Sequence, residues 1–175
     1  MDMPIPDEVP GALSLAGDVI NAPQNVIDKI SSFIPAETRG IVIQISNMTA
    51  LTLALKTTDF KSGGLEPSVL PAPVIGPFSQ TVFGVKSAGI ATGVAGTVIY
   101  ESDGIDVLVC SFNNPFVGSN AVNVKLTDSL AATLGCRAVI GRGNHAAANF
   151  VLFDTERDNS RPADNPEDLR DPQGI

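Results

Sequence analysis

The chain has 175 residues, of which 43% are hydrophobic and 17% charged, so it is long enough to bury the core of one domain. Its net charge of −8 argues against nucleic acid, whose phosphates need clustered Lys and Arg, and against strong attraction to anionic membranes. Neutral lipids and glycans are the partners that this charge leaves open.

The N-terminal part changes character at residue 12. Residues 1–11 contain three prolines and three acids and are predicted to be a flexible N-terminus. Residues 12–35 then repeat apolar side chains at 100° per residue, which predicts an amphipathic helical segment. Its apolar face includes Leu15, Val19, Ile20, Val26, Ile27, Ile30, Phe33 and Ile34.

Pro23 should break or kink this helix, so we expect it in the first turn of a helix that ends near Pro35. The apolar stripe nevertheless keeps its phase through Pro23. That continuity favours a helix that forms on occasion across the whole segment, roughly 34 Å long and close to the thickness of a bilayer core. The alternative is that both halves simply pack on the body of the protein.

The body, residues 36–154, reads as a series of short strands. We expect strands over 40–45, 51–55, 78–85, 92–100, 105–112, 122–126, 136–140 and 149–153, with a loop over 57–64 and a proline-rich crossing over 67–77. Asp128 is expected to cap one short helix that ends at Leu134. Without βαβ alternation, this pattern predicts a mostly β protein, an antiparallel β-sandwich of two sheets. Residues 155–175 are predicted to be a disordered acidic tail.

A resemblance to a known family lies between Ala91 and Leu126. The run A-T-G-x-A-G-x-x-x-Y-x-S-D-G is followed by an apolar strand, F-x-x-P and N-V-K-L. Together with the run Val26–Ile30, it resembles the actinoporins, pore-forming cytolysins with a β-sandwich body and a detachable amphipathic N-terminal helix. The resemblance implies membrane binding, insertion of the helix and self-oligomerisation on the membrane.

The resemblance also implies a lipid headgroup site. Ser62 and Pro115 match the family's pocket serine and proline, whereas Ala95 stands in place of a valine and Asn113 in place of a serine. Phe116 and Val117 correspond to the loop that contacts the membrane. The tyrosines that hold choline in the family have no counterpart, so cation–π recognition of a quaternary ammonium lacks its rings.

The sequence shows no catalytic constellation, and we expect no enzyme, metal or cofactor. His145, the only histidine, lies in a glycine-rich stretch and is predicted to be a solvated loop residue. Cys110 and Cys136 are predicted to be buried thiols, and Asn47-Met48-Thr49 is a glycosylation sequon. The chain has no visible signal peptide or transmembrane run, which leaves its localisation open; a toxin-like protein would be secreted or would act at a target membrane.

Two functions from different classes fit these observations. The first is an actinoporin-like, membrane-binding and pore-forming protein. The second is a non-lytic module that binds lipid, glycan or protein on the same scaffold, with the helix as a permanent part of the fold. A third is self-association through an exposed strand edge.

Overall fold

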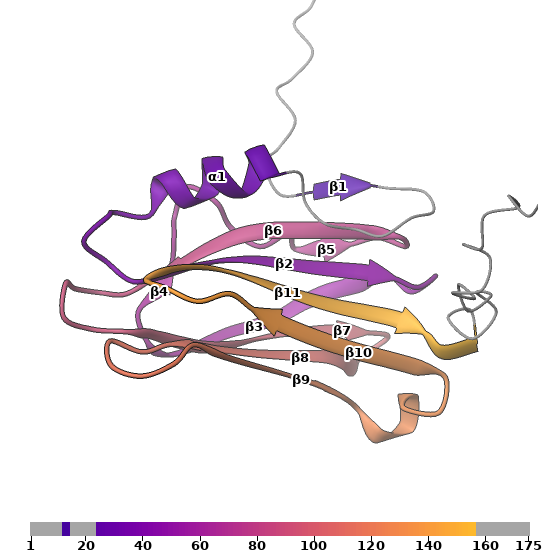
Figure 1. The fold of residues 1–175 in the computed structure, drawn as a ribbon. Helices are drawn as coiled ribbons and strands as arrows, with labels where there is room; N and C mark the ends of the chain where they lie inside the picture. The colour runs from indigo at the N-terminus through magenta and orange to yellow at the C-terminus, as the bar shows by residue number, and fades with distance from the viewer. Residues whose placement is uncertain (1–11, 15–23, 157–175) are drawn as a thin grey trace, which may run out of the picture.

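The structure is a computed structural model that describes residues 12–14 and 24–156. Two sheets pack face to face, with one helix on the outer face of the first sheet (Figure 1). The elements are β1 (Ala12–Ser14), α1 (Gln24–Phe33), β2 (Gly40–Met48), β3 (Leu53–Ser62), β4 (Gly64–Leu65), β5 (Val74–Ile75), β6 (Ser79–Lys86), β7 (Val94–Ser102), β8 (Ile105–Asn114), β9 (Ala121–Leu126), the 3₁₀ turn η1 (Asp128–Leu130), β10 (Leu134–Ile140) and β11 (His145–Asp154).

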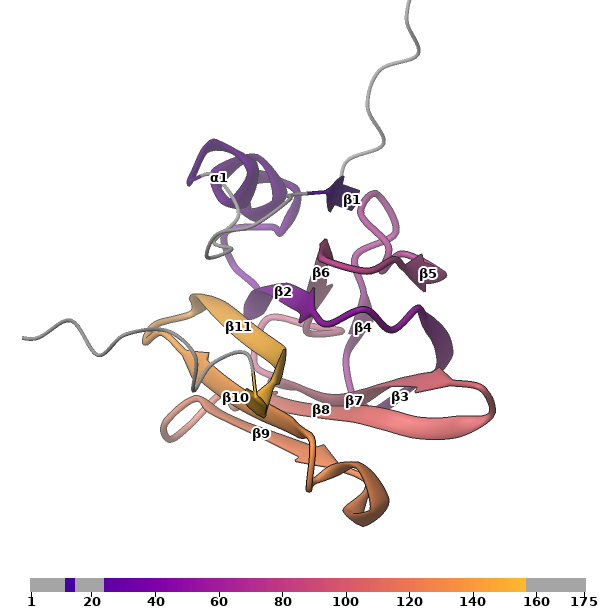
Figure 2. The ribbon, with the colours of Figure 1, turned by 90° about the vertical axis from the view of Figure 1, so that its right-hand side faces the viewer.

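Sheet A has the strand order β1-β6-β2-β11-β10, with β4 also paired to β6, and sheet B has the order β5-β3-β7-β8-β9. Every pair is antiparallel except β2 with β11, which run parallel. Figure 2 shows the two layers edge-on, with α1 on the side of sheet A that faces away from sheet B. The predicted β-sandwich is therefore confirmed.

The main core lies between the sheets and follows the alternation of the strands. In β2, Ile41, Ile43 and Ile45 point inward with no exposed surface, while Val42 and Gln44 point toward the outer face. From sheet B, side chains such as Leu108 and Phe112 meet them. The period of two in these strands is what puts one apolar set between the sheets.

Helix α1 packs through a second and much smaller apolar cluster. Ile30 and Ile34 are buried against residues on the outer face of sheet A and on the segment after β4, namely Val42, Val69 and Val82. Val26 and Ile27 are partly buried against the same cluster, whereas Phe33 remains 40% exposed. The helix thus contacts the body without contributing to the core between the sheets.

The N-terminal prediction is wrong in one part. Residues 12–14 were expected to be helical but form β1, which pairs antiparallel with Ser79–Thr81 of β6. The physical reason is that β6 would otherwise leave unpaired backbone groups at this edge of sheet A, and a short extended segment satisfies them. Leu15, Val19 and Ile20 lie outside the described residues, as do the flexible N-terminus 1–11 and most of the predicted tail, 157–175. Thr155 is described, and both its backbone N–H and its hydroxyl donate to Thr133 O.

Two further local predictions are wrong. Residues 57–62 were expected to be a loop but belong to β3, because they pair with β7. The side chains on the outer face of this strand are polar, so the sequence pattern did not indicate a strand. Asp128 does not cap η1; Thr127 holds that position, and its hydroxyl donates instead to Asp106 O.

The glycosylation sequon lies inside the fold. Asn47 has no exposed surface, and its side-chain amide donates to Leu51 O and Gly76 O. Its carbonyl oxygen accepts from the N–H and hydroxyl of Thr49, so both residues of the sequon shape the turn between β2 and β3.

Candidate functional site

One end of the sandwich collects four connections, and we call it the loop end. It comprises residues 34–39 between α1 and β2, residues 87–93 between β6 and β7, residues 115–120 between β8 and β9, and residues 141–144 between β10 and β11. These connections lie together at the left of Figure 1. The opposite end carries the tight β7–β8 turn at Asp103 and Gly104 and the η1 connection, and we call it the hairpin end.

Three of the predicted headgroup residues lie in one row across sheet B at the loop end. Ser62 pairs with Ala95 in β7, and Ala95 pairs with Asn113 in β8. Neighbouring strands are about 4.8 Å apart, so the row spans roughly 10 Å on the outer face. Ser62 and Asn113 are exposed and Ala95 is half-buried between them. The row therefore places the Ser62 hydroxyl and the Asn113 amide on either side of the small methyl side chain of Ala95.

An aromatic pair supports this row from the inner face. Phe60, Gly96 and Phe112 occupy the next register positions, and the two rings pack edge to face with centroids 5.9 Å apart. A Cβ on Gly96 would approach both rings to 3.0 Å and Asp59 O to 2.6 Å. The absence of a side chain at Gly96 thus lets the aromatic pair close beneath the row.

A second row of hydroxyls lies one step further along the outer face. Thr97 pairs with Ser111, and their hydroxyl oxygens are 3.1 Å apart. Asp59 and Asn123 flank them on β3 and β9. Sequence reasoning missed this row, because only the pairing of β7 with β8 brings Thr97 and Ser111 together.

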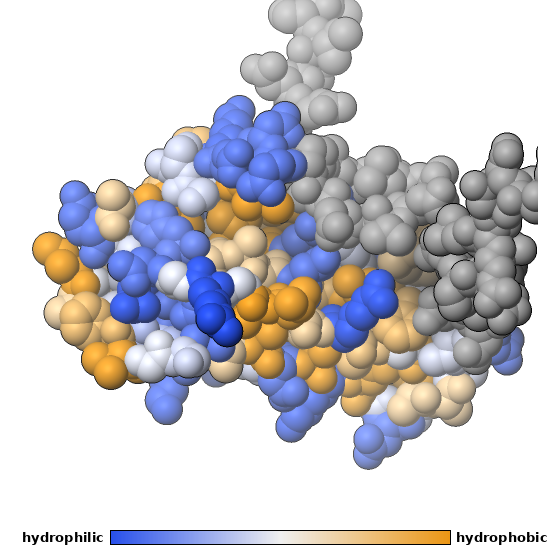
Figure 3. All heavy atoms as spheres, viewed as in Figure 1, coloured by the Kyte–Doolittle hydropathy of each residue, from blue (hydrophilic) through white to orange (hydrophobic). Residues whose placement is uncertain are grey.

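The loop end also carries an apolar tip, formed by Ile90, Phe116 and Val117. Their side chains are 72%, 49% and 82% exposed. The loop with Ile90 and the loop with Phe116 lie side by side, since a Cβ on Gly93 would meet Asn114 O at 2.7 Å and Pro115 Cα at 2.8 Å. In Figure 3 apolar residues stand at the left-hand end of the molecule, where these loops lie. Pro115 itself is half-buried, directly after β8.

Arg39 joins the tip to the α1–β2 connection. Its guanidinium donates to Asn114 Oδ1 at 3.1 Å and to Phe116 O at 2.8 Å, and it lies 5.5 Å from the centre of the Phe116 ring. The backbone N–H of Arg39 donates to Ser87 Oγ, and Ser87 N–H donates to Arg39 O, which fixes the start of the loop that carries Ile90. One residue therefore holds both loops of the tip.

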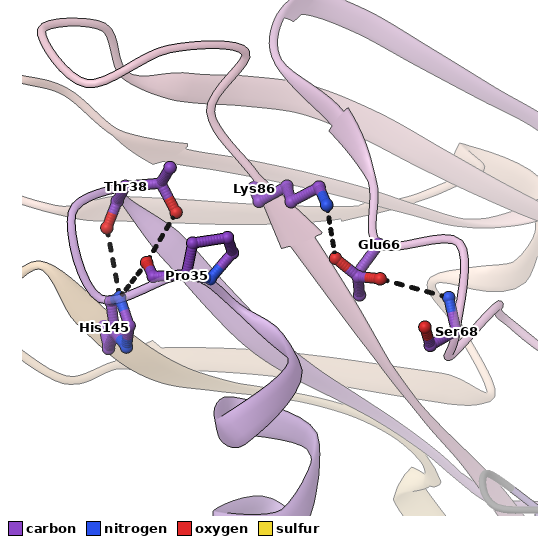
Figure 4. A network of polar contacts seen from close by, with 6 residues as sticks. All are labelled: Pro35, Thr38, Glu66, Ser68, Lys86 and His145. Carbon is purple, nitrogen blue, oxygen red and sulfur yellow. Dashed lines mark hydrogen bonds and ion pairs between the residues drawn. The ribbon is translucent and has the colours of Figure 1, made fainter.

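Asn114 and His145 hold the remaining connections at this end. Asn114 is fully buried, and its side-chain amide donates to Gly40 O at 3.1 Å and Asn144 O at 2.9 Å. His145 Nε2 lies 3.2 Å from Pro35 O and 3.0 Å from Thr38 O (Figure 4), so this nitrogen carries a proton that it donates to them. His145 is thus the first residue of β11, and its side chain is hydrogen-bonded to the α1–β2 connection. The prediction of a solvated loop residue is wrong.

An ion pair between a half-buried lysine and a buried carboxylate lies near α1. Lys86 Nζ is 2.6 Å from Glu66 Oε2, and Ser68 N–H donates to Glu66 Oε1 (Figure 4). Burial by itself raises the pKa of the Glu66 carboxyl, but the bonds from Lys86 and Ser68 outweigh it and hold that pKa below its usual value. Glu66 is therefore an ionised, structural carboxylate.

The sole tyrosine does not belong to the site. Tyr100 is buried in the main core, and its hydroxyl donates to Ala72 O at 2.7 Å, which ties down the proline-rich crossing. Burial raises its pKa well above the usual value. Cys110 and Cys136 are free thiols, and burial raises the pKa of each.

Sequence reasoning missed Arg39 and Ile90. Ile90 is a lone apolar residue in a short glycine-containing loop, a signal that could have been used. Arg39 gave no such signal, because the contacts of its guanidinium lie 75 and 77 residues away in the chain. Among residues 24–156, no group of three or more His, Cys, Asp or Glu residues has the geometry to hold a metal ion.

Comparisons with known proteins identify the fold. The structure is similar to the lipid binding protein Nakanori, with a TM-score of 0.59 and 20% identity over 74% of this chain and 80% of that one. It is also similar to the RahU protein, solved in complex with a TRIS molecule, with a TM-score of 0.55 and 10% identity over 66% and 95% of the two chains. A third neighbour is IP-1A from Alcaligenes faecalis, with a TM-score of 0.55 and 11% identity over 67% and 91%. No family model and no curated protein matches the sequence.

The helix in the described part of the chain does not have the length and apolar character that a bilayer-spanning helix requires.

Proposed function

We propose that this protein binds membrane lipid through the loop end of its sandwich, as a binding protein rather than an enzyme. The observation that carries the proposal is the apolar tip, in which Ile90, Phe116 and Val117 are exposed on two adjacent loops beside the Ser62–Ala95–Asn113 row. Exposed apolar side chains gathered at one place mark a contact surface. The similarity in fold to the lipid binding protein Nakanori adds support.

In this proposal the tip enters the interface and the row receives a headgroup. Ser62 and Asn113 supply a hydroxyl and an amide to a phosphate or sugar hydroxyl, and Ala95 leaves room between them. The neutral or zwitterionic headgroup expected from the sequence rests on the net charge of −8 of the whole chain, not on the charges at the loop end. The described part of the chain offers no aromatic cage here, since Tyr100 is buried elsewhere, so the ammonium group of choline is not the recognised element.

Vesicle flotation tests the binding proposal. Phosphatidylcholine vesicles should carry the protein upward, and replacing Phe116→Ser and Val117→Ser together should weaken binding at least about tenfold, because two apolar side chains no longer leave water. Ile105→Ser is the matched control, since Ile105 is 46% exposed at the start of β8, beside the turn at the hairpin end. An equal loss with the control, or no loss with the tip variant, would contradict the proposal.

Pore formation is the more specific form of the proposal. The N-terminal segment would leave the body, form a longer helix and insert, and several protomers would assemble on the membrane. The separate apolar cluster beneath α1 supports this step, because the helix can undock without opening the core between the sheets. We expect a chain without residues 1–23 to keep vesicle binding and to lose release of an encapsulated dye.

The alternative is a non-lytic module that binds lipid, glycan or protein. The pairing of β1 with β6 favours it, since the segment before α1 is tied into sheet A as a strand. Binding to vesicles by the full chain without any dye release would support this alternative against the pore.

A further inference from the structure

The charge of the chain is unevenly distributed, and this distribution bears on the lipid. Residues 24–156 carry eight Lys or Arg and ten Asp or Glu, a net charge of only −2, and the remaining −6 of the total −8 comes from residues 1–23 and 157–175. The net charge of the whole chain therefore says little about the potential at the tip.

Within residues 24–156 the two ends of the sandwich differ in sign. The loop end carries Arg39, Lys61, Lys86 and Arg142 against the carboxylates Glu37 and Glu66, with Asp59 two register positions further in along β3 and β7. The Glu66 carboxylate is buried and paired with Lys86. The hairpin end carries most of the acids, namely Glu101, Asp103, Asp106, Asp128, Asp154 and Glu156, against Lys56 and Lys125.

Two of the cations at the loop end are free to act outward. Lys61 lies next to Ser62 in β3 and is exposed, and Arg142 is exposed between Gly141 and Gly143. The Gly141 and Gly143 carbonyls accept from the side-chain amide of Asn120, which places Arg142 beside the loop that carries Phe116. Neither cation forms an ion pair with another described residue.

We infer that the loop end docks on bilayers that contain anionic phospholipids, with Lys61 and Arg142 facing the net negative bilayer surface on either side of the apolar tip. The inference rests on the proposed function and names its lipid class. Apolar side chains flanked by cations fit an anionic interface, because each Lys or Arg near such a surface is attracted to it while the apolar groups leave water. The acids at the hairpin end point away from the membrane in this orientation and are weakly repelled, since the field falls off within a Debye length.

Flotation with two vesicle compositions tests the inference on the full chain. Adding phosphatidylglycerol to phosphatidylcholine should strengthen binding, and raising the salt above physiological strength should remove that gain. Lys61→Gln and Arg142→Gln should each weaken binding to the mixed vesicles about fivefold while leaving binding to pure phosphatidylcholine unchanged. Lys125→Gln, an exposed lysine near the hairpin end, is the matched control and should have no effect on either.

The outcomes separate this inference from the proposed function. Binding to both vesicles with equal strength, or an equal loss with Lys125→Gln, overturns the inference and leaves lipid binding in place. Loss of binding to pure phosphatidylcholine in Lys61→Gln and Arg142→Gln also overturns it, because the cations would then serve the headgroup site itself. Failure to bind either vesicle overturns both.

Discussion

The core between the two sheets and the cluster beneath α1 both bury apolar side chains, but they hold different parts of the molecule together. The first joins residues from both sheets, such as Phe83, Leu108 and Phe150, into one continuous interior. The second consists of five buried residues from α1, the residue that follows it, sheet A and the segment after β4. The second cluster shares no buried residue with the first, so α1 contributes no side chain to the core between the sheets.

Phe83→Ala should produce the largest effect on stability. The Phe83 side chain has no exposed surface in the main core, so its truncation should lower the free energy of unfolding by about 3–5 kcal/mol. Urea unfolding measures the change, with Val139→Ala as an exposed control expected within about 0.5 kcal/mol. A small effect of Phe83→Ala would mean that the sheets are less tightly packed than this comparison requires.

Ile30→Ala should produce a smaller and more local effect. Truncating this side chain should weaken the docking of α1 by about 2–4 kcal/mol, because Ile30 is the buried residue that α1 contributes to the small cluster. Hydrogen exchange should quicken at the amides of α1 while the amides of β2 and β11 keep their protection. Phe33→Ala, on the exposed side of the same helix, is the control. Equal quickening in the strands would mean that the two clusters unfold together.

Tyr100→Phe sharpens the description of the main core. The change keeps the buried ring and removes only the bond to Ala72 O, so we expect a loss of about 1 kcal/mol. The loss should be accompanied by faster exchange or proteolysis in the proline-rich crossing, residues 67–77. An unchanged crossing would show that other contacts suffice to hold it.

The smallest expected effect is a pH dependence that arises beneath α1. The folded-state pKa of Glu66 lies below its unfolded value of about 4.5, so the ion pair contributes stability above that pH. The contribution should disappear as the pH falls through the folded-state pKa. The Cβ of Glu66 and the side chain of Ile30 both lie over Gly84, so exchange at α1 should report the loss.

Glu66→Gln is the control for this acid effect. It removes the titrating group, so the stability of the variant should vary less with pH in the same range than that of the parent. An identical pH dependence in both would assign the acid effect to other carboxylates.

Much of the body could be predicted from local pattern. The alternation of apolar side chains placed β6, β7, β8 and β9 close to their observed bounds. Asp103 and Gly104, between the expected strands 92–100 and 105–112, are residue types that readily adopt the positive φ that they show. Helix α1 follows the apolar periodicity from Val26 to Ile34. The strand at 57–62 was missed, because its outer side chains are polar and its ladder to β7 is a contact between distant segments.

The candidate site could be predicted only in part. The resemblance singled out Ser62, Ala95 and Asn113 one at a time, at positions 18 or more residues apart in the chain. That they form one row follows from the registers of β3 with β7 and of β7 with β8. Their role in binding stays a prediction, as does that of Pro115, Phe116 and Val117.

The order of apolar and polar residues determined by itself that this chain is a two-sheet sandwich with an amphipathic helix near its N-terminus, because side-chain periodicity is a local property. Only the tertiary structure decided that Arg39 clamps the Phe116 loop, that His145 holds the exit of α1, and that cations and acids separate to opposite ends. These features depend on which loops meet in space. Strand register and sheet order control that meeting, and no short stretch of sequence contains either.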